Sequence, residues 1–156
     1  MKALFAAVFT MTLVMAAGAA PACDRPAGAA GIEAELAGWI NAERAKKGLS
    51  KLGVSAGLER GALAHACDMA SRGFFAHEGP GGPAFGARMK KTGYRFGAAV
   101  ENIAKSGDAG ADTAARIWRK SSAHWANILD RRLDDMGVAV ATDGRNVFYV
   151  FIGAGK

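Results

Sequence analysis

The amino-acid sequence predicts a single domain of the α+β class, in which helices come first and an antiparallel sheet is completed at the end of the chain. Its 156 residues are enough for one core and too few for two. Apolar residues recur at helical spacing in the first half. Two apolar runs, residues 136–141 and 147–152, flank an Asp-Gly turn signal near the C-terminus. Helices followed by strands favour helical layers packed on an antiparallel sheet.

The first 22 residues have the layout of a cleavable signal peptide. Met1-Lys2 gives a basic start, residues 3–17 are almost wholly apolar, and Ala20-Pro21-Ala22 is an A-x-A cleavage pattern. An uncleaved membrane anchor is less favoured, because the apolar run is shorter than the ~20 residues that a spanning helix needs. Acylation of Cys23, as in a lipoprotein, is a weaker alternative. We therefore expect a secreted or periplasmic protein.

Composition and charge limit the partners of the exported chain. Residues 23–31, rich in Ala, Gly and Pro, are expected to be an N-terminal tether, and residues 32–156 the domain. The formal net charge is +6. A basic exported protein can associate with anionic lipids or other cell-envelope components. The basic residues are scattered without an aromatic-interleaved stripe, so we expect no nucleic-acid partner. We expect a monomer without a transmembrane segment in the mature chain.

The two cysteines, Cys23 and Cys67, are predicted to form one disulfide. An exported chain meets an oxidising compartment, and an even pair of cysteines there favours a bridge. The alternative is two unrelated thiols, one terminal and one buried. Closing this loop contributes about 3–4 kcal/mol to the free energy of unfolding in the chain-entropy model.

The helices are predicted from apolar periodicity and from their stop signals. The first begins at Ile32, with Leu36, Trp39 and Ile40 on one face, and ends before Gly48. Ser55 can cap a second helix that Gly73 closes, with His65 on its apolar face. Two shorter helices are expected over residues 85–92 and 112–120.

The strands are predicted from short apolar runs. Residues 100–104 are expected to form a strand with one interior charge, Glu101. Residues 136–141 and 147–152 are expected to form a hairpin around Asp143-Gly144. The last run is apolar throughout, so we expect it to be central and covered on both faces.

Three polar sites stand among apolar neighbours and are the candidates for chemistry. His77 follows two aromatic residues, Glu101 and Asn102 interrupt a strand, and Ser121 and His124 belong to an evenly spaced run from Trp118 to Ile128 across the fourth helix and the turn beyond it. Two imidazoles and a carboxylate are a ligand set for zinc or another divalent metal, and the same groups can transfer protons.

Structural roles for these residues remain open alternatives. Glu101 could simply pair with Arg88 or Arg95. Asn102 could satisfy backbone groups in a turn. His65, on the apolar face of its helix, is interpreted as a packing residue and left out of the site. No G-x-S-x-G elbow, H-E-x-x-H helix or phosphate-binding Gly-rich loop is present, and Ser121 near His124 lacks an orienting third group, so a serine hydrolase is disfavoured.

The order of the segments resembles the CAP superfamily (SCP/PR-1-like domains), in its compact bacterial secreted form. The matching stretches, which run from about Ile32 to the C-terminus, are Trp39-Ile40-Asn41-Ala42-Glu43-Arg44, Ala64-His65-Ala66-x-Asp68-Met69-Ala70, Phe75-x-His77, Glu101-Asn102-Ile103-Ala104, Trp118-x-x-Ser121-x-x-His124-x-x-Asn127-Ile128 and Gly137-Val138-Ala139.

The resemblance implies a three-layer α-β-α sandwich with a small antiparallel sheet and a cleft that carries His77, His124 and Glu101. A second cleft glutamate, common in the family, has no counterpart between Glu101 and His124. Members are mostly binding modules, so we expect a non-enzymatic extracytoplasmic module whose cleft takes a lipid, an envelope component or a protein, with a weak divalent-metal site at His77, Glu101 and His124. The alternatives are a metal-assisted hydrolase and a bare structural domain.

Overall fold

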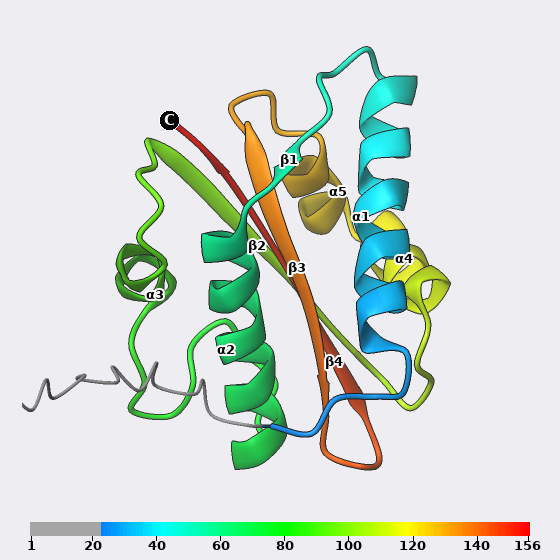
Figure 1. Ribbon diagram of the computed structural model, residues 1–156, viewed down its shortest axis with the longest axis vertical. Coiled ribbons are helices and arrows are strands. Elements are labelled where there is room, and N and C mark those ends of the chain that lie inside the picture. Colours follow the sequence, from blue (N-terminus) through cyan, green and yellow to red (C-terminus); the bar gives the residue numbers. More distant parts are fainter. Residues whose placement is uncertain (1–22) are drawn as a thin grey trace, which may run out of the picture.

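The structure, a computed structural model, describes residues 23–156, so the predicted signal peptide of residues 1–22 lies outside the described residues. Five helices and four strands follow one another along this part of the chain (Figure 1). In order they are α1 (Ala29–Lys46), β1 (Gly53–Val54), α2 (Ala56–Arg72), α3 (Phe85–Lys91), β2 (Ala98–Ser106), α4 (Ala111–Lys120), α5 (Ser122–Ile128), β3 (Asp135–Thr142) and β4 (Val147–Gly155).

The strands form one sheet in the order β1-β3-β4-β2. Strand β4 pairs antiparallel with both β3 and β2, and all nine of its residues are buried, which confirms that the apolar C-terminal run is central. Strand β1 was not predicted. It has only two residues, too few for a periodic pattern, and it pairs parallel with β3.

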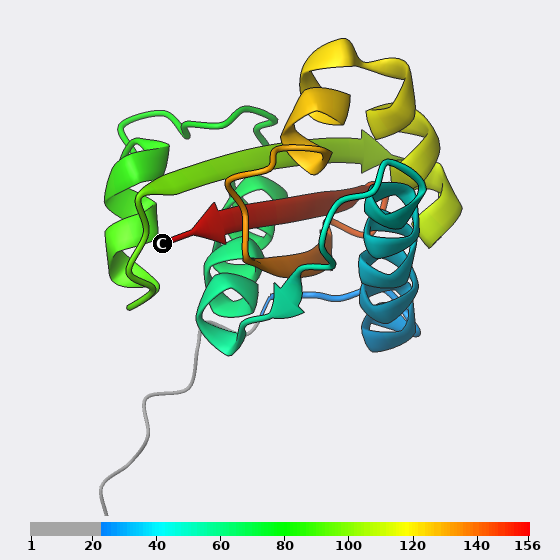
Figure 2. The same cartoon turned by 90° about the horizontal axis from the view of Figure 1, so that it is seen from above.

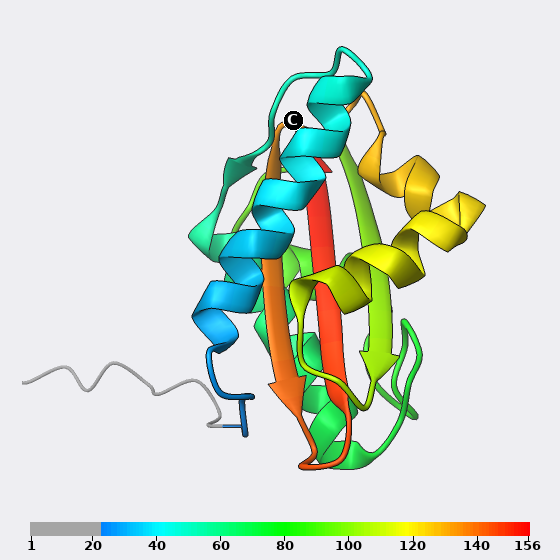
Figure 3. The same ribbon diagram turned by 90° about the vertical axis from the view of Figure 1, so that its right-hand side faces the viewer.

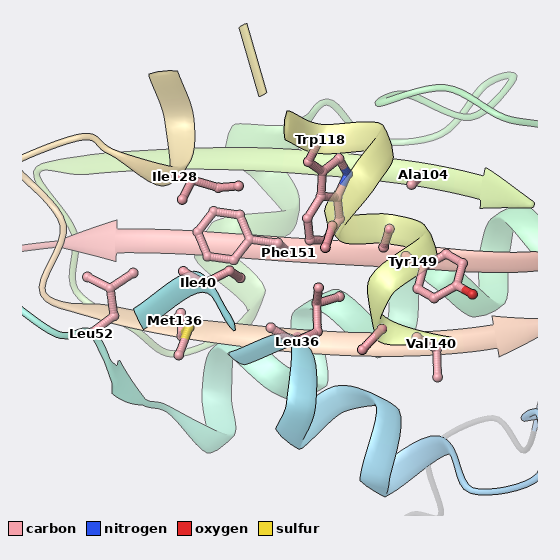
Figure 4. Close-up of a cluster of buried hydrophobic side chains, with 14 of the residues drawn as sticks. Leu36, Ile40, Leu52, Ala104, Trp118, Ile128, Met136, Val140, Tyr149 and Phe151 are labelled. Carbon is pink, nitrogen blue, oxygen red and sulfur yellow. The ribbon is translucent and has the colours of Figure 1, made fainter. Parts of the chain in front are cut away.

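Helices cover both faces of the sheet, so the predicted α-β-α sandwich is confirmed. Helices α1, α4 and α5 lie on one face, and α2 and α3 lie on the other (Figures 1 and 3). Figure 4 shows the first core, where Trp118 from α4 and Ile40 from α1 meet Phe151 of β4. In the second core, α2 approaches β3 so closely that a Cβ on Gly137 would lie 2.1 Å from the backbone of Leu58.

Several element boundaries differ from the sequence prediction. Helix α1 begins at Ala29 rather than Ile32, because Ala29 is itself buried and extends the apolar face into the expected tether. Residues 122–128, expected to form a turn, make the separate helix α5, because Ser121 caps it by accepting a hydrogen bond from the His124 backbone N–H (3.3 Å). Strand β2 extends over residues 98–106 rather than 100–104.

Two long-range links hold the chain segments around this core. The predicted disulfide is present between Cys23 and Cys67, whose Cα atoms are 5.5 Å apart, and it ties the start of the described chain to α2. Arg44 of α1, which is 1% exposed, donates to the backbone oxygens of Ser50 (2.9 Å), Ile128 (2.9 Å) and Asp130 (2.8 Å). These bonds fix the end of α5.

None of the helices within residues 23–156 combines the length and apolar character that crossing a membrane requires.

Candidate functional site

Strand β2 lies at an edge of the sheet (Figure 2). Two adjacent buried polar residues of this strand, Glu101 and Asn102, point to opposite faces. Neighbouring residues of a strand point to opposite sides. Glu101 therefore faces the α2 layer, where its carboxylate lies 3.8 Å from His65 Nε2. Asn102 faces the α5 layer, where its Nδ2 donates to the His124 carbonyl oxygen (2.9 Å). This one pair of residues links the two helical layers at the open edge.

The Glu101 carboxylate is the centre of a buried ionic network. Glu101 is 5% exposed. Arg88 Nη1 donates to Oε2 (2.8 Å) and Arg88 Nη2 donates to Oε1 (2.9 Å), so the guanidinium is bidentate. His77 Nδ1 lies 2.9 Å from Oε1. Of the two arginines expected as alternatives, Arg88 is therefore the partner. A buried carboxylate needs such compensation, because an unpaired one is costly.

The contact with Glu101 fixes the orientation of the His77 ring. A carboxylate accepts hydrogen bonds, so Nδ1 of His77 must carry the hydrogen in this contact. The lone pair is then left on Nε2 when the ring is neutral, and the side chain is 52% exposed. Arg88 Nη2 also donates to the His77 backbone oxygen (2.7 Å), so both the ring and its backbone are held. His77 thus offers a pre-oriented imidazole to solvent.

His124 comes from the other face of the sheet, on α5. The side-chain amide of Asn127 donates to Asn102 Oδ1 (2.9 Å). This bond and the bond from Asn102 to the His124 carbonyl oxygen hold α5 against β2. Burial lowers the pKa of His124, and the nearby His77 lowers it further. Its Nδ1 is buried and has no hydrogen-bond partner within the described chain. The expected site residues Asn102 and Ser121 are therefore positioning groups for His124.

His65 belongs to the network although sequence reasoning set it aside. It is 2% exposed, as expected of a packing residue, but its Nε2 lies 3.1 Å from the Ala76 carbonyl oxygen and faces Glu101. Burial lowers the pKa of His65. Periodicity placed it on the apolar stripe, which was correct. Only the folded structure, in which His65 lies 3.8 Å from the Glu101 carboxylate, reveals that the apolar stripe of α2 runs past Glu101.

The arrangement does not fit a three-ligand metal site. Within residues 23–156 no group of three or more His, Cys, Asp or Glu side chains is placed to hold a metal ion. Both carboxylate oxygens of Glu101 accept hydrogen bonds from Arg88. Glu101 also contacts His77 Nδ1, as a carboxylate does when it orients a histidine that binds a metal through its other nitrogen. His77 and His124 remain as potential ligands, and two imidazoles alone make a weak site.

The same contacts limit the proton chemistry of the site. A general base must be within reach of a substrate proton, and Glu101 is buried behind His77 and Arg88. The Ser121 hydroxyl caps α5 instead of pairing with an imidazole. We call the half-exposed His77 together with His124 the histidine face; burial lowers the pKa of His124, and His77 is near enough to lower it further. The histidine face can donate and accept hydrogen bonds from a fixed geometry.

Comparison with known proteins identifies the family. Residues 38–154 match CAP, the cysteine-rich secretory protein family. Over 128 residues the chain is 31% identical to YkwD, an uncharacterized protein of Bacillus subtilis (strain 168); the match covers 82% of this chain and 49% of YkwD, so the chain spans about half of that relative.

Solved structures show the same fold. An extracellular SCP-domain protein of Bacillus anthracis str. Ames has a TM-score of 0.72 at 24% identity, covering 82% of this chain and 41% of that one. An outer surface protein of Borrelia burgdorferi has a TM-score of 0.75 at 18% identity, covering 86% of this chain and 99% of that one. The match over residues 38–154 shows that this chain belongs to the cysteine-rich secretory protein (CAP) family.

Proposed function

We propose that the protein is a non-enzymatic, extracytoplasmic binding module whose histidine face engages a lipid, another envelope component or a protein. The N-terminal signal-peptide pattern and the names of its structural neighbours, an extracellular protein and an outer surface protein, support the location. The main support for a binding role is that the Glu101 carboxylate is unavailable as a general base. This carboxylate is buried and neutralised by Arg88, so it serves to orient His77 rather than to take a proton from a substrate.

An exposed aromatic residue supports an amphipathic ligand. Phe75 is 46% exposed and lies two positions before His77; with Val54 it makes up the exposed large hydrophobic residues of the described chain. A surface that joins an aromatic ring to an imidazole of fixed orientation offers both an apolar contact and a directed hydrogen bond. A ligand with a hydrocarbon part and a polar group matches that combination.

Retention of envelope material on the immobilised protein tests the proposal. A detergent extract of the envelope is passed over the wild type, over His77→Ala/His124→Ala, and over the control Lys46→Gln, which changes an exposed residue of α1. Mass spectrometry is expected to find a component held by the wild type and the control and lost from the double variant. Equal retention by all three would refute the histidine face as the binding surface.

Catalysis is assayed with the same proteins. Casein and a p-nitrophenyl ester are incubated with each, with and without zinc. We expect no turnover above the rate without protein. Hydrolysis that disappears in the double variant would instead make the site a hydrolase.

A further inference from the structure

The main chain at Cys23 is held in place by contacts with two separate elements. The disulfide brings Cys23 to α2, where its Cα atom lies 5.5 Å from that of Cys67. The carbonyl oxygen of the next residue, Asp24, accepts a hydrogen bond from the Thr142 N–H (2.8 Å) at the end of β3. Figure 1 shows this first described segment passing from α2 across β3 to α1. Cys23 therefore has a fixed place in the fold, although it directly follows the predicted cleavage site.

The surroundings of Cys23 are acidic. A pocket of about 550 Å³ is lined by both cysteines of the bridge and by three carboxylates, those of Asp24, Asp68 and Asp143. Asp68 directly follows Cys67, and Asp143 directly follows Thr142, so the contacts of the first segment bring Cys23 close to both. Within residues 23–156 no Lys, Arg or His lines this pocket. The start of the described chain thus lies in a region of negative charge.

Asp143 is ionised throughout the neutral pH range. Hydrogen bonds from the side chain and backbone of Asn146 and from the Arg145 N–H lower the pKa of Asp143 to about 2. Lys105 of β2 adds a smaller electrostatic effect in the same direction. The hydrogen-bond donors are uncharged groups, so the negative charge of Asp143 is retained.

One of the other two carboxylates of the lining is already paired. Arg72 donates to Asp68 (3.2 Å), which offsets that charge. Arg25, the cation nearest to Cys23 in the sequence, pairs with Glu33 outside the lining. Asp24 takes part in none of the salt bridges formed within the described chain, and neither does the carboxylate of the β3–β4 turn. Two of the three carboxylates therefore lack a cationic partner.

We propose that cleavage after Ala22 creates an ammonium group at Cys23 that these carboxylates bind, so that removal of the signal peptide itself stabilises the exported fold. A free α-amino group has a pKa of about 7.7–8.0 and is mostly protonated at neutral pH. In the uncleaved chain the same nitrogen is an uncharged amide. The pattern Ala20-Pro21-Ala22 places the new terminus at Cys23. The proposal rests on this cleavage and does not involve the histidine face.

The pH dependence of this ion pair has a definite sign. The carboxylates raise the pKa of the Cys23 ammonium above its value in the unfolded chain, because they favour the charged form. The stabilisation is then complete below about pH 7.7 and is lost as the pH rises through the raised pKa. Both unpaired carboxylates are exposed, so the pairing increases the folded-to-unfolded ratio by about threefold.

An NMR titration of the mature protein that begins at Cys23 tests the pairing. The chain has two cysteines, so labelling with [¹³C]cysteine gives two Cα signals, and the Cys23 signal follows the ionisation of the terminus. We expect an acid dissociation constant about threefold smaller in the wild type than in Asp24→Asn/Asp143→Asn. An Asn-Gly pair supports the same hairpin turn. The matched control, Glu35→Gln/Glu59→Gln, removes the same charge from exposed residues outside the lining and should keep the wild-type constant.

Urea unfolding shows whether the pairing depends on the position of the terminus. A form that retains Ala20-Pro21-Ala22 carries its ammonium three residues away from Cys23. The mature protein is expected to have a folded-to-unfolded ratio about threefold larger than this form at pH 7 and an equal ratio at pH 9.5. Equal ratios at pH 7 overturn the proposal, and so does the same dissociation constant in the wild type and in Asp24→Asn/Asp143→Asn. N-terminal sequencing that finds the exported protein to begin at another residue overturns it as well.

Discussion

Replacing Glu101 with Gln removes the charge at the centre of the ionic network while keeping the size of the side chain. Glu101 is 5% exposed, and its carboxylate accepts two hydrogen bonds from Arg88 and one from His77. Gln keeps one acceptor oxygen and places an NH₂ group against these donors, so Arg88 loses its counter-charge. Removing one partner of a buried ion pair costs about 3–5 kcal/mol. The Arg88 side chain is 14% exposed, so water relieves part of that cost and we expect about 3 kcal/mol.

A double-mutant cycle separates this pairing from general damage to the core. Urea unfolding is measured for the wild type, Glu101→Gln, Arg88→Met and the double variant, with Lys90→Gln as a control that removes an exposed charge from α3. Each single variant is expected to lose about 3 kcal/mol, and the double variant about 2 kcal/mol less than the sum. The control should change the free energy of unfolding by less than about 0.5 kcal/mol. Additive losses would refute the ionic coupling.

Three further outcomes follow from the structure. Cys67→Ser should lower the free energy of unfolding by about 3–4 kcal/mol in urea, since the bridge closes a 44-residue separation; an unchanged midpoint would contradict this. Burial lowers the pKa of His65, so as the pH drops below about 6.5 the unfolded state takes up the proton first and the free energy of unfolding falls. Urea unfolding should therefore show a smaller loss of this free energy between pH 7.5 and pH 5 in His65→Gln than in the wild type. Zinc titrated calorimetrically at pH 7.5 should bind weakly, and His77→Ala or His124→Ala should abolish the heat; equal heats would remove support for a metal.

The elements that could be predicted from the sequence are those whose burial follows a period. Residues 147–152, apolar without interruption and preceded by the Asp143-Gly144 turn, were expected to be a central covered strand, and they lie in β4. Helix α5 was missed because it follows α4 with only Ser121 between them, without a Gly stop signal such as the one that closes α3, and because its start depends on the Ser121 cap. Boundaries such as Ala29 depend on what the chain packs against, which no local pattern records.

The sequence singled out three of the residues in this network and missed the contacts that define their roles. His77, Glu101 and His124 stood out because polar groups among apolar neighbours are costly without partners. Which partner each residue takes is a tertiary fact. Arg88 reaches Glu101 only because α3 packs beside β2, and that pairing changes the carboxylate from an expected ligand into a group that orients His77. His65 joins the network for the same reason.

The ring nitrogens of His77 give the most direct test of this account. Long-range ¹H–¹⁵N NMR spectra of uniformly labelled protein, recorded at pH 8.5, report which nitrogen carries the hydrogen. The contact with Glu101 predicts hydrogen on Nδ1 and a free lone pair on Nε2 in the wild type, and a loss of this preference in Glu101→Gln. Hydrogen on Nε2 in the wild type, or spectra of His77 that are the same in both proteins, would contradict the claim that Glu101 orients this imidazole for binding.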